Sequence, residues 1–315
     1  MALFEQKVKH IPSNLLKDKY GWPPFSVLHT LSFDWQRRRD EWEVIVGDST
    51  EGRDVRRYNA TPTNTFSARG ASAKQAESVS EFDPYLCELM YRWFSLPDFS
   101  VLDPFAGGWT RGLVATVLDR KYYGIDLSEI QVKSNEAKFA DFYSKYTPTK
   151  YRPEYFCKNS ADFLQKFDKE VDMVFTCPPY YNLEKYSKDP LDISNAPTYE
   201  DFLKIYSDIL YLSSTHLKND SFFVIVTSEV TSNAFVIAES NYVGLVPDTI
   251  SILRDRCNLY YYNEIILENN IGSLPIRAPR YFRRTRKIGR HHQNILVFYK
   301  GDLTHIEDKF NSEII

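Results

Sequence analysis

The sequence predicts an α/β fold in which helices cover both faces of one mainly parallel sheet, giving three layers. From residue 84 onward, short apolar strand patterns alternate with helical patterns. Strands that are joined by helices run parallel and need cover on both faces. Hydrophobic residues make up 43% of the 315 residues and aromatic residues 15%, which is enough for a large packed core.

Each predicted element has a local signal. The strands are short apolar segments that end at turn residues, and the helices show apolar residues at helical spacing, with Ser128 as the N-cap of one of them. The predicted strands are 100–105, 121–126, 155–158, 171–176, 221–227, 260–267 and 294–299, and the main predicted helices are 84–94, 110–118, 128–143 and 199–217.

The two ends of the chain differ from this core. Residues 1–75 are rich in proline, tryptophan, arginine and turn residues, which predicts an irregular N-terminal extension with one short helix over 35–42. We therefore expect residues 76–302 to form the main domain and residues 303–315 to form a C-terminal tail.

Several protein classes are excluded by composition. No stretch of about 18 apolar residues occurs, and the first residues lack the pattern of a signal peptide, so we expect a cytoplasmic protein without a membrane span. The four cysteines form no CxxC pair, which argues against a zinc site or a disulfide framework. His291 and His292 have no further ligands nearby in the sequence, so no metal is expected.

A basic segment stands out against a formal net charge of −3. Residues 277–292 contain no acid and include Tyr281 and Phe282 among the cations, which favours contact with phosphates over a merely solvated surface. The shorter cluster Arg37–Arg39 is equally compatible with either interpretation. The expected phosphate contacts are Arg277, Arg280, Arg283, Arg284, Arg286, Lys287 and Arg290.

A loop rich in small residues follows the first predicted strand of the core. It reads Asp103-Pro104-Phe105-Ala106-Gly107-Gly108 and opens a helix, so its backbone can approach a ligand closely and unpaired N–H groups face that ligand. Asp126 ends the next strand, 19 residues after Gly107, where an acid can accept hydrogen bonds from ribose hydroxyls. The alternative is a tight turn with a capping aspartate.

A second loop follows the strand at 171–176 and reads Cys177-Pro178-Pro179-Tyr180. Two prolines stiffen the turn and fix the carbonyls near Cys177 and Pro178, which suits hydrogen bonds from an exocyclic amino group of a base. Tyr180 offers a flat face on which a flipped base can stack. Alone, this tetrapeptide is equally compatible with a rigid structural turn.

Together and in this order, the two loops resemble the motifs of DNA amino-methyltransferases, in particular phage and prophage DNA methylases. The resemblance covers most of the chain and is sharpest over 78–194. It implies a seven-stranded, Rossmann-like S-adenosylmethionine-dependent methyltransferase sheet, with S-adenosylmethionine as the cofactor. It also implies methylation of adenine N6 or cytosine N4 of a base flipped from double-stranded DNA.

The resemblance also assigns individual residues. Ser80 and Phe82 would contact the donor from the segment before the first strand. Leu127 would do so beside Asp126. Asn159 and Ser160 stand where an acid usually contacts the adenine of the donor. Cys177, Pro178, Pro179 and Tyr180 would form the catalytic motif, and the loop at 182–197, with Glu184, Tyr186 and Ser187, would help to select the target.

Two positions depart from the family pattern. Its usual donor motif is Asp-Pro-Phe-x-Gly-x-Gly, and Trp109 stands at the last glycine, where a large ring could narrow the pocket or displace the loop. Cys177 stands where the family has Asp, Asn or Ser, so the target base stays open.

Two other functions also stay open. One is an RNA amino-methyltransferase of the tRNA type, and the other is a DNA-binding homologue that has lost activity. The sequence does not distinguish a monomer from a homodimer, nor a restriction-modification role from phage self-protection.

Overall fold

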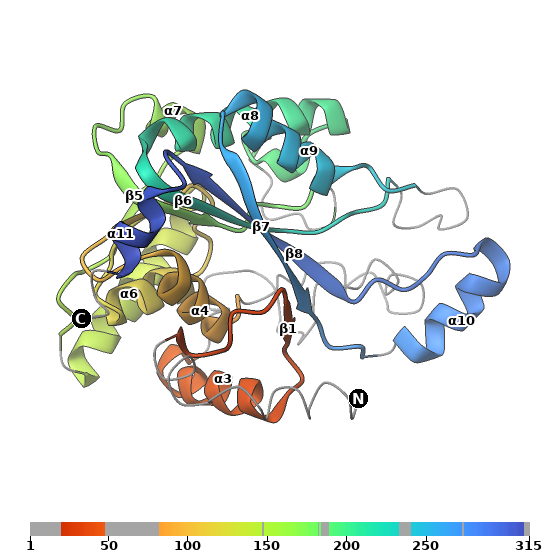
Figure 1. Ribbon diagram of the computed structural model, residues 1–315, viewed down its shortest axis with the longest axis horizontal. Helices are drawn as coiled ribbons and strands as arrows, with labels where there is room; N and C mark the ends of the chain where they lie inside the picture. Colours follow the sequence, from red (N-terminus) through yellow and green to blue (C-terminus); the bar gives the residue numbers. More distant parts are fainter. Residues whose placement is uncertain are drawn as a thin grey trace.

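The computed structural model describes residues 20–47, 82–146, 148–181, 183, 189–232, 241–272 and 274–311. Their strands form one eight-stranded sheet in the order β1-β7-β8-β6-β5-β2-β3-β4 (Figure 1). All neighbours pair in parallel except that β8 runs antiparallel to both β6 and β7. The strands are β1 (Val27–His29), β2 (Ser100–Asp103), β3 (Lys121–Asp126), β4 (Glu154–Cys157), β5 (Val171–Thr176), β6 (Leu217–Thr227), β7 (Tyr260–Glu268) and β8 (His292–Lys300).

The helices follow the strands in the alternating order that the sequence predicts. They are α3 (Phe33–Val46), α4 (Pro84–Phe94), α5 (Thr110–Val117), α6 (Glu129–Lys145), α7 (Ser160–Leu164), α8 (Tyr199–His216), α9 (Leu245–Ser251), α10 (Leu274–Thr285) and α11 (His305–Asn311). A 3-10 turn, Ile193–Asn195, precedes α8, and a π-helical turn, Ile252–Arg256, extends α9.

The predicted fold class is confirmed, with one strand more than the predicted seven. The additional strand is β1, which lies in the segment expected to be irregular and pairs with Ile266–Glu268 of β7. The helix expected over 35–42 is longer than predicted and is α3, capped by Ser32. The Ser32 hydroxyl accepts the Trp35 backbone N–H, which satisfies one of the open donors of the first turn.

Two apolar layers enclose the sheet. Strand β6 shows why: Phe222, Val224 and Val226 face one cluster, which includes residues of α3, α4 and α5. The alternate residues Phe223 and Ile225 face a second cluster, which includes residues of α8 and α9. Side chains that alternate along a strand are expected to serve both faces when helices cover both.

The sheet places the ends of several strands at one edge. The carboxyl ends of β2, β3, β4, β5 and β6 lie there because these strands are parallel neighbours. Strand β8 is antiparallel, so its amino end at His292 reaches the same edge. The strand order reverses between β2 and β5, and ligands of open α/β sheets bind at this kind of reversal.

Candidate functional site

Asp103 ends β2 and is fully buried. Its Oδ2 accepts Arg111 Nε–H at 2.6 Å and Tyr122 Oη–H at 2.7 Å. Its Oδ1 accepts Thr176 Oγ1–H at 2.7 Å and the Phe105 N–H at 3.2 Å. The carboxylate predicted to contact the donor therefore faces the protein interior, where it holds the loop in place.

Arg111 is a functional candidate that the sequence prediction missed. Its guanidinium donates to the carbonyl of Phe105 at 2.6 Å and to that of Ala106 at 3.0 Å, so it holds the loop backbone at two positions. Burial by itself would lower the pKa of Arg111, but Asp103, Tyr122 and Cys177 together outweigh burial and hold that pKa well above its ordinary value. A charged residue in the otherwise uncharged helix α5 was the available signal.

Phe82, which the resemblance assigns to a donor contact, packs against Arg111 and Phe175. The Arg111 guanidinium lies over the Phe82 ring, 4.6 Å from its centroid, and the ring packs edge-on against Phe175 of β5. Ser80 and the loop positions 182 and 184–188, which include Glu184, Tyr186 and Ser187, lie outside the described residues.

Gly107 and Asp126 meet at the edge. Gly107 has a φ of 54°, a conformation that favours glycine, and its N–H donates to Asp126 Oδ2 at 2.8 Å. Asp126 Oδ1 accepts the Ser128 N–H at 2.8 Å. The half-buried Asp126 therefore presents a carboxylate beside the Gly107 backbone, and a carboxylate can accept hydrogen bonds from a ligand.

Trp109 turns away from this edge. Its ring is 4% exposed and packs against Phe139 and Phe142 of α6, with centroid distances of 5.2 and 6.4 Å. The indole N–H is buried without a hydrogen-bond partner among the described residues. The Trp109 ring, at the position where the family has a glycine, therefore packs the start of α5 against α6. It does not replace the small residues Ala106, Gly107 and Gly108 of the loop.

The residues expected at the donor adenine lie beside the same loop. Asn159 caps α7, because its Oδ1 accepts the N–H groups of Ala161 and Asp162. Ser160 Oγ–H donates to the Pro104 carbonyl at 2.6 Å, which ties the two loops together. The Leu127 carbonyl accepts the Cys157 thiol at 3.7 Å, so these contacts fix the backbone around the expected ligand position.

The Cys177–Tyr180 loop, which the resemblance predicts to be catalytic, follows β5 directly. Thr176, the last residue of β5, is hydrogen-bonded to Asp103, and this links the start of that loop to the start of the Asp103–Gly108 loop, the predicted donor loop. Pro178 is buried and Pro179 is half-buried. Tyr180 is 7% exposed, and its Oη lies 3.4 Å from Cys177 Sγ and 3.1 Å from Gln293 Nε2.

The predicted phosphate contacts divide into two groups. Arg277, Arg280, Arg283 and Arg284 lie on α10, with Arg286 and Lys287 just after it, and Figure 1 shows α10 set apart from the helical layers beyond the end of the sheet. Within the described part of the chain, Arg280, Arg283 and Arg284 form no ion pair and are exposed. Phosphate contact by this group stays a prediction.

Arg290 belongs to a different environment. The sequence predicts a phosphate contact, whereas the structure directs its guanidinium to Ser228 Oγ and the His292 carbonyl, both at 3.2 Å, and to Asn294. Burial lowers the pKa of Arg290 from its ordinary value. Arg290 lies two residues before β8, where the chain enters the sheet, and its side chain therefore packs against the end of the sheet.

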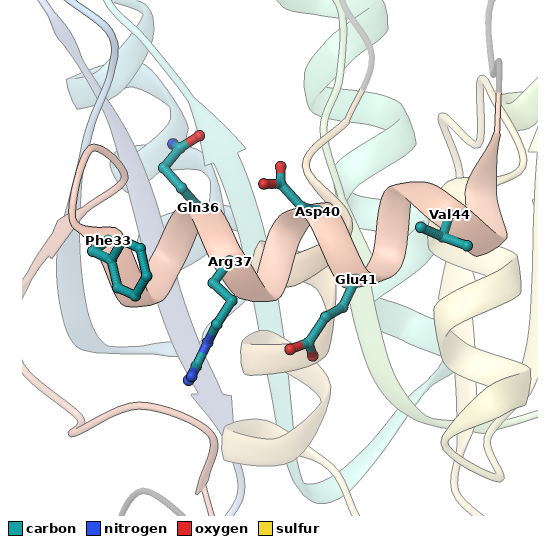
Figure 2. Close-up of a pocket in the computed structure, with 6 residues that line it drawn as sticks. All are labelled: Phe33, Gln36, Arg37, Asp40, Glu41 and Val44. Atoms are coloured by element: carbon teal, nitrogen blue, oxygen red, sulfur yellow. The ribbon is translucent and has the colours of Figure 1, made fainter.

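The Arg37–Arg39 cluster is accounted for by ion pairs on and beside α3. Arg37 pairs with Asp34, Arg38 with Glu41 and Glu88, and Arg39 with Glu43. A hollow of about 440 Å³ lies along the outer side of the same helix, and Figure 2 shows the side chains that line it. They are Phe33, Gln36, Arg37, Asp40, Glu41 and Val44, none of which the sequence predicts for the site.

The described part of the chain offers neither a metal site nor a membrane span. Among these residues, no three His, Cys, Asp or Glu side chains gather as a set of metal ligands. Over the same ranges, no helix is long and apolar enough to cross a membrane.

Comparison with known proteins gives distant structural likenesses. No protein-family model matches the chain, and no curated protein is similar to it in sequence. The structure is similar to TrmN from Thermus thermophilus, with a TM-score of 0.43, 16% identity, and coverage of 70% of this chain and 49% of TrmN, about half of its length.

Two further likenesses are of the same order. Magnesium protoporphyrin IX methyltransferase from Synechocystis PCC 6803, solved with bound SAH, gives a TM-score of 0.46 with 12% identity over 84% of this chain and 95% of that chain. A candidate DNA modification methylase from Thermus thermophilus gives 0.33 with 19% identity over 45% and 50%. At this distance, the substrate has to be argued from the residues of the chain itself.

Proposed function

We propose that this chain is an S-adenosylmethionine-dependent methyltransferase that methylates an exocyclic amino group of a flipped adenine or cytosine in DNA. The observation that carries the proposal is the 2.7 Å hydrogen bond from Thr176 Oγ1 to Asp103 Oδ1. It joins the residue before Cys177 to the residue that opens the donor loop. A methyl donor held by one loop and an amino group held by the other would then be neighbours.

The donor loop fits S-adenosylmethionine by its chemistry. Gly107 and Gly108 are half-buried, without side chains that would keep a ligand from the backbone, and α5 begins two residues later. Asp126 lies at the carboxyl end of β3 beside Gly107, and its carboxylate can accept hydrogen bonds from ribose hydroxyls. When bound, S-adenosylmethionine supplies an electrophilic methyl group on a sulfonium.

We expect Asp126→Ala to weaken S-adenosylmethionine binding by roughly 10- to 100-fold, because charge-assisted hydrogen bonds contribute about 1.5–3 kcal/mol. Isothermal titration calorimetry measures the change. Asp168→Ala is the matched control, since Asp168 is an exposed acid in the turn before β5, at the opposite end of that strand. Equal affinity of Asp126→Ala and the wild type would remove Asp126 from the donor site.

The catalytic loop supplies placement and electrostatics for the acceptor. The lone pair of a base amino group is conjugated into the ring, so the group is a poor nucleophile. Carbonyls fixed by Pro178 and Pro179 can accept its hydrogens and draw the nitrogen toward a tetrahedral form that attacks in line. Tyr180 is 7% exposed, so a base can stack on its face only after neighbouring side chains move aside.

DNA is the proposed partner because α10 projects exposed cations. Replacing Arg283, Arg284 and Arg286 together with glutamine should flatten the salt dependence of DNA binding, by up to about one logarithmic unit of slope for each phosphate that is no longer neutralised. Fluorescence anisotropy at several salt concentrations gives the slope for the wild type and the triple variant.

The control for this measurement removes the same charge elsewhere. Lys133, Lys145 and Lys150 are exposed and pair with Glu129, Asp141 and Asp98. They lie on α6 or just after it, far across the molecule from α10 (Figure 1). Their replacement by glutamine should change the slope less. An equal change in both triple variants would mean that α10 adds only to the overall charge.

Transfer of a tritiated methyl group tests the proposed function. The purified protein is incubated with labelled S-adenosylmethionine and either duplex DNA or tRNA. The proposal predicts label in DNA. Label in tRNA alone would identify an RNA methyltransferase, and binding of DNA without transfer would identify an inactive homologue.

A further inference from the structure

Tyr180 receives a hydrogen bond from a distant part of the chain. The side-chain amide of Gln293 donates from Nε2 to Tyr180 Oη over 3.1 Å, and 113 positions separate the two residues. Both side chains are buried, with exposed fractions of 8% for Gln293 and 7% for Tyr180. A buried bond between neutral groups at the end of a sheet fixes orientation as well as distance.

The tyrosine hydroxyl also lies close to the thiol of Cys177. A phenol has one hydrogen to donate and lone pairs to accept with. Gln293 donates to Oη, and Cys177 Sγ lies 3.4 Å from the same oxygen, where either the phenol or the thiol can donate. The amide, the phenol and the thiol therefore form one connected set of polar groups that ends at Cys177, the first residue of the Cys177–Tyr180 loop.

Gln293 itself stands on a rigid support. It is the second residue of β8 and lies opposite Leu267 of β7. Asn294 donates to Glu264 Oε1 at 2.6 Å, and Arg290 contacts both the His292 carbonyl and Asn294. Pairing with β7 therefore fixes the backbone at Gln293, and the bonds of its neighbour Asn294 are separate from the bond that Gln293 forms with Tyr180.

We propose that Gln293 is a positioning residue for methyl transfer. It fixes the ring of Tyr180 against the flipped base and, through the hydroxyl of that tyrosine, orients the thiol of Cys177. This inference rests on the proposed function, because the base and the transferred methyl group belong to it. It adds a role for the amino end of β8 in a site otherwise formed by the carboxyl ends of parallel strands.

A double-mutant cycle with Tyr180→Phe tests this role. Gln293→Ala alone should lower kcat about tenfold, the rate equivalent of one hydrogen bond, and leave KM for S-adenosylmethionine within about twofold. In the Tyr180→Phe background, Gln293→Ala should lower kcat no further, because its partner hydroxyl is already absent.

Asn294→Ala is the matched control. Asn294 is a similarly buried amide at the adjacent position. It donates to Glu264 and accepts from Arg290, and neither bond involves Tyr180. Its effect on kcat should be the same in the wild-type protein and in the Tyr180→Phe background. If Gln293 has a purely structural role, Gln293→Ala should also lower kcat by the same factor in both backgrounds. That result would overturn the proposal.

Urea unfolding of the wild type, the two single variants and their double variant separates this inference from the proposed function. If the bond between Gln293 and Tyr180 exists, the shifts in the unfolding midpoint of the two single variants do not add in the double variant. Additive shifts overturn the proposal. If the shifts are not additive but the wild-type protein methylates no nucleic acid, the proposed function is contradicted. The hydrogen bond between Gln293 and Tyr180 is still supported in that case.

Discussion

Tyr180→Ala is expected to lower methyl transfer to DNA by about a hundredfold, while S-adenosylmethionine still binds. Stacking of a base on an aromatic side chain contributes about 1–3 kcal/mol, and a misplaced amino group also reacts more slowly. The hydrogen bonds of the donor loop include those to Asp126, Arg111 and Ser160, and Tyr180→Ala removes none of these three. Single-turnover kinetics measure transfer, and calorimetry measures donor binding.

Tyr180→Phe is the graded control for this substitution. It keeps the ring for stacking and removes only the hydroxyl that bonds to Gln293 and approaches Cys177. Its transfer rate should therefore lie between those of the wild type and the alanine variant. If Tyr180→Ala weakened donor binding as much as it slowed transfer, the assignment of separate donor and acceptor loops would be wrong.

Asp103→Ala is expected to have the largest effect on stability, a loss of about 3–5 kcal/mol in the free energy of unfolding. The substitution leaves the buried guanidinium of Arg111 without its carboxylate and removes the acceptor of Tyr122 and Thr176. Burial then disfavours the charged arginine, which keeps its bonds to the Phe105 and Ala106 carbonyls but has lost its ion pair. Urea denaturation measures the change.

Asp141→Ala is the control for Asp103→Ala. Asp141 also pairs with a cation, Lys145, but both side chains are exposed, so water replaces the missing partner. Its unfolding midpoint should stay close to that of the wild type. Similar destabilisation by both substitutions would show that Asp103 does not organise the core beneath the two loops.

The strands and helices with strong local signals could be predicted from the sequence. Strands β3 and β5 and helix α4 begin and end where their apolar patterns do, and Ser128 caps α6 as expected. Strand β1 has three residues, too few to show an alternating pattern, and it forms because β7 offers it an edge. Helix α10 has Pro279 in its interior, which argues against a helix, although its charged and apolar residues segregate strongly at helical spacing.

The candidate site was predictable as two loops but not as one unit. Each loop follows a strand, so a local pattern identifies it. The bonds that join and support the loops link residues far apart in sequence, such as Thr176 with Asp103 and Gln293 with Tyr180. The directions of Trp109 and Arg290 depend on packing against α6 and β8, which no local pattern contains.

Nucleoside mass spectrometry of DNA tests the central claim most directly. The wild-type chain and Tyr180→Ala are expressed in a host strain without DNA methyltransferases of its own, and DNA and tRNA are digested and compared. We predict N6-methyladenine or N4-methylcytosine in DNA from cells with the wild-type chain, and little or none with the variant. DNA that lacks both bases in wild-type cells, with or without new methylation of tRNA, would contradict the account.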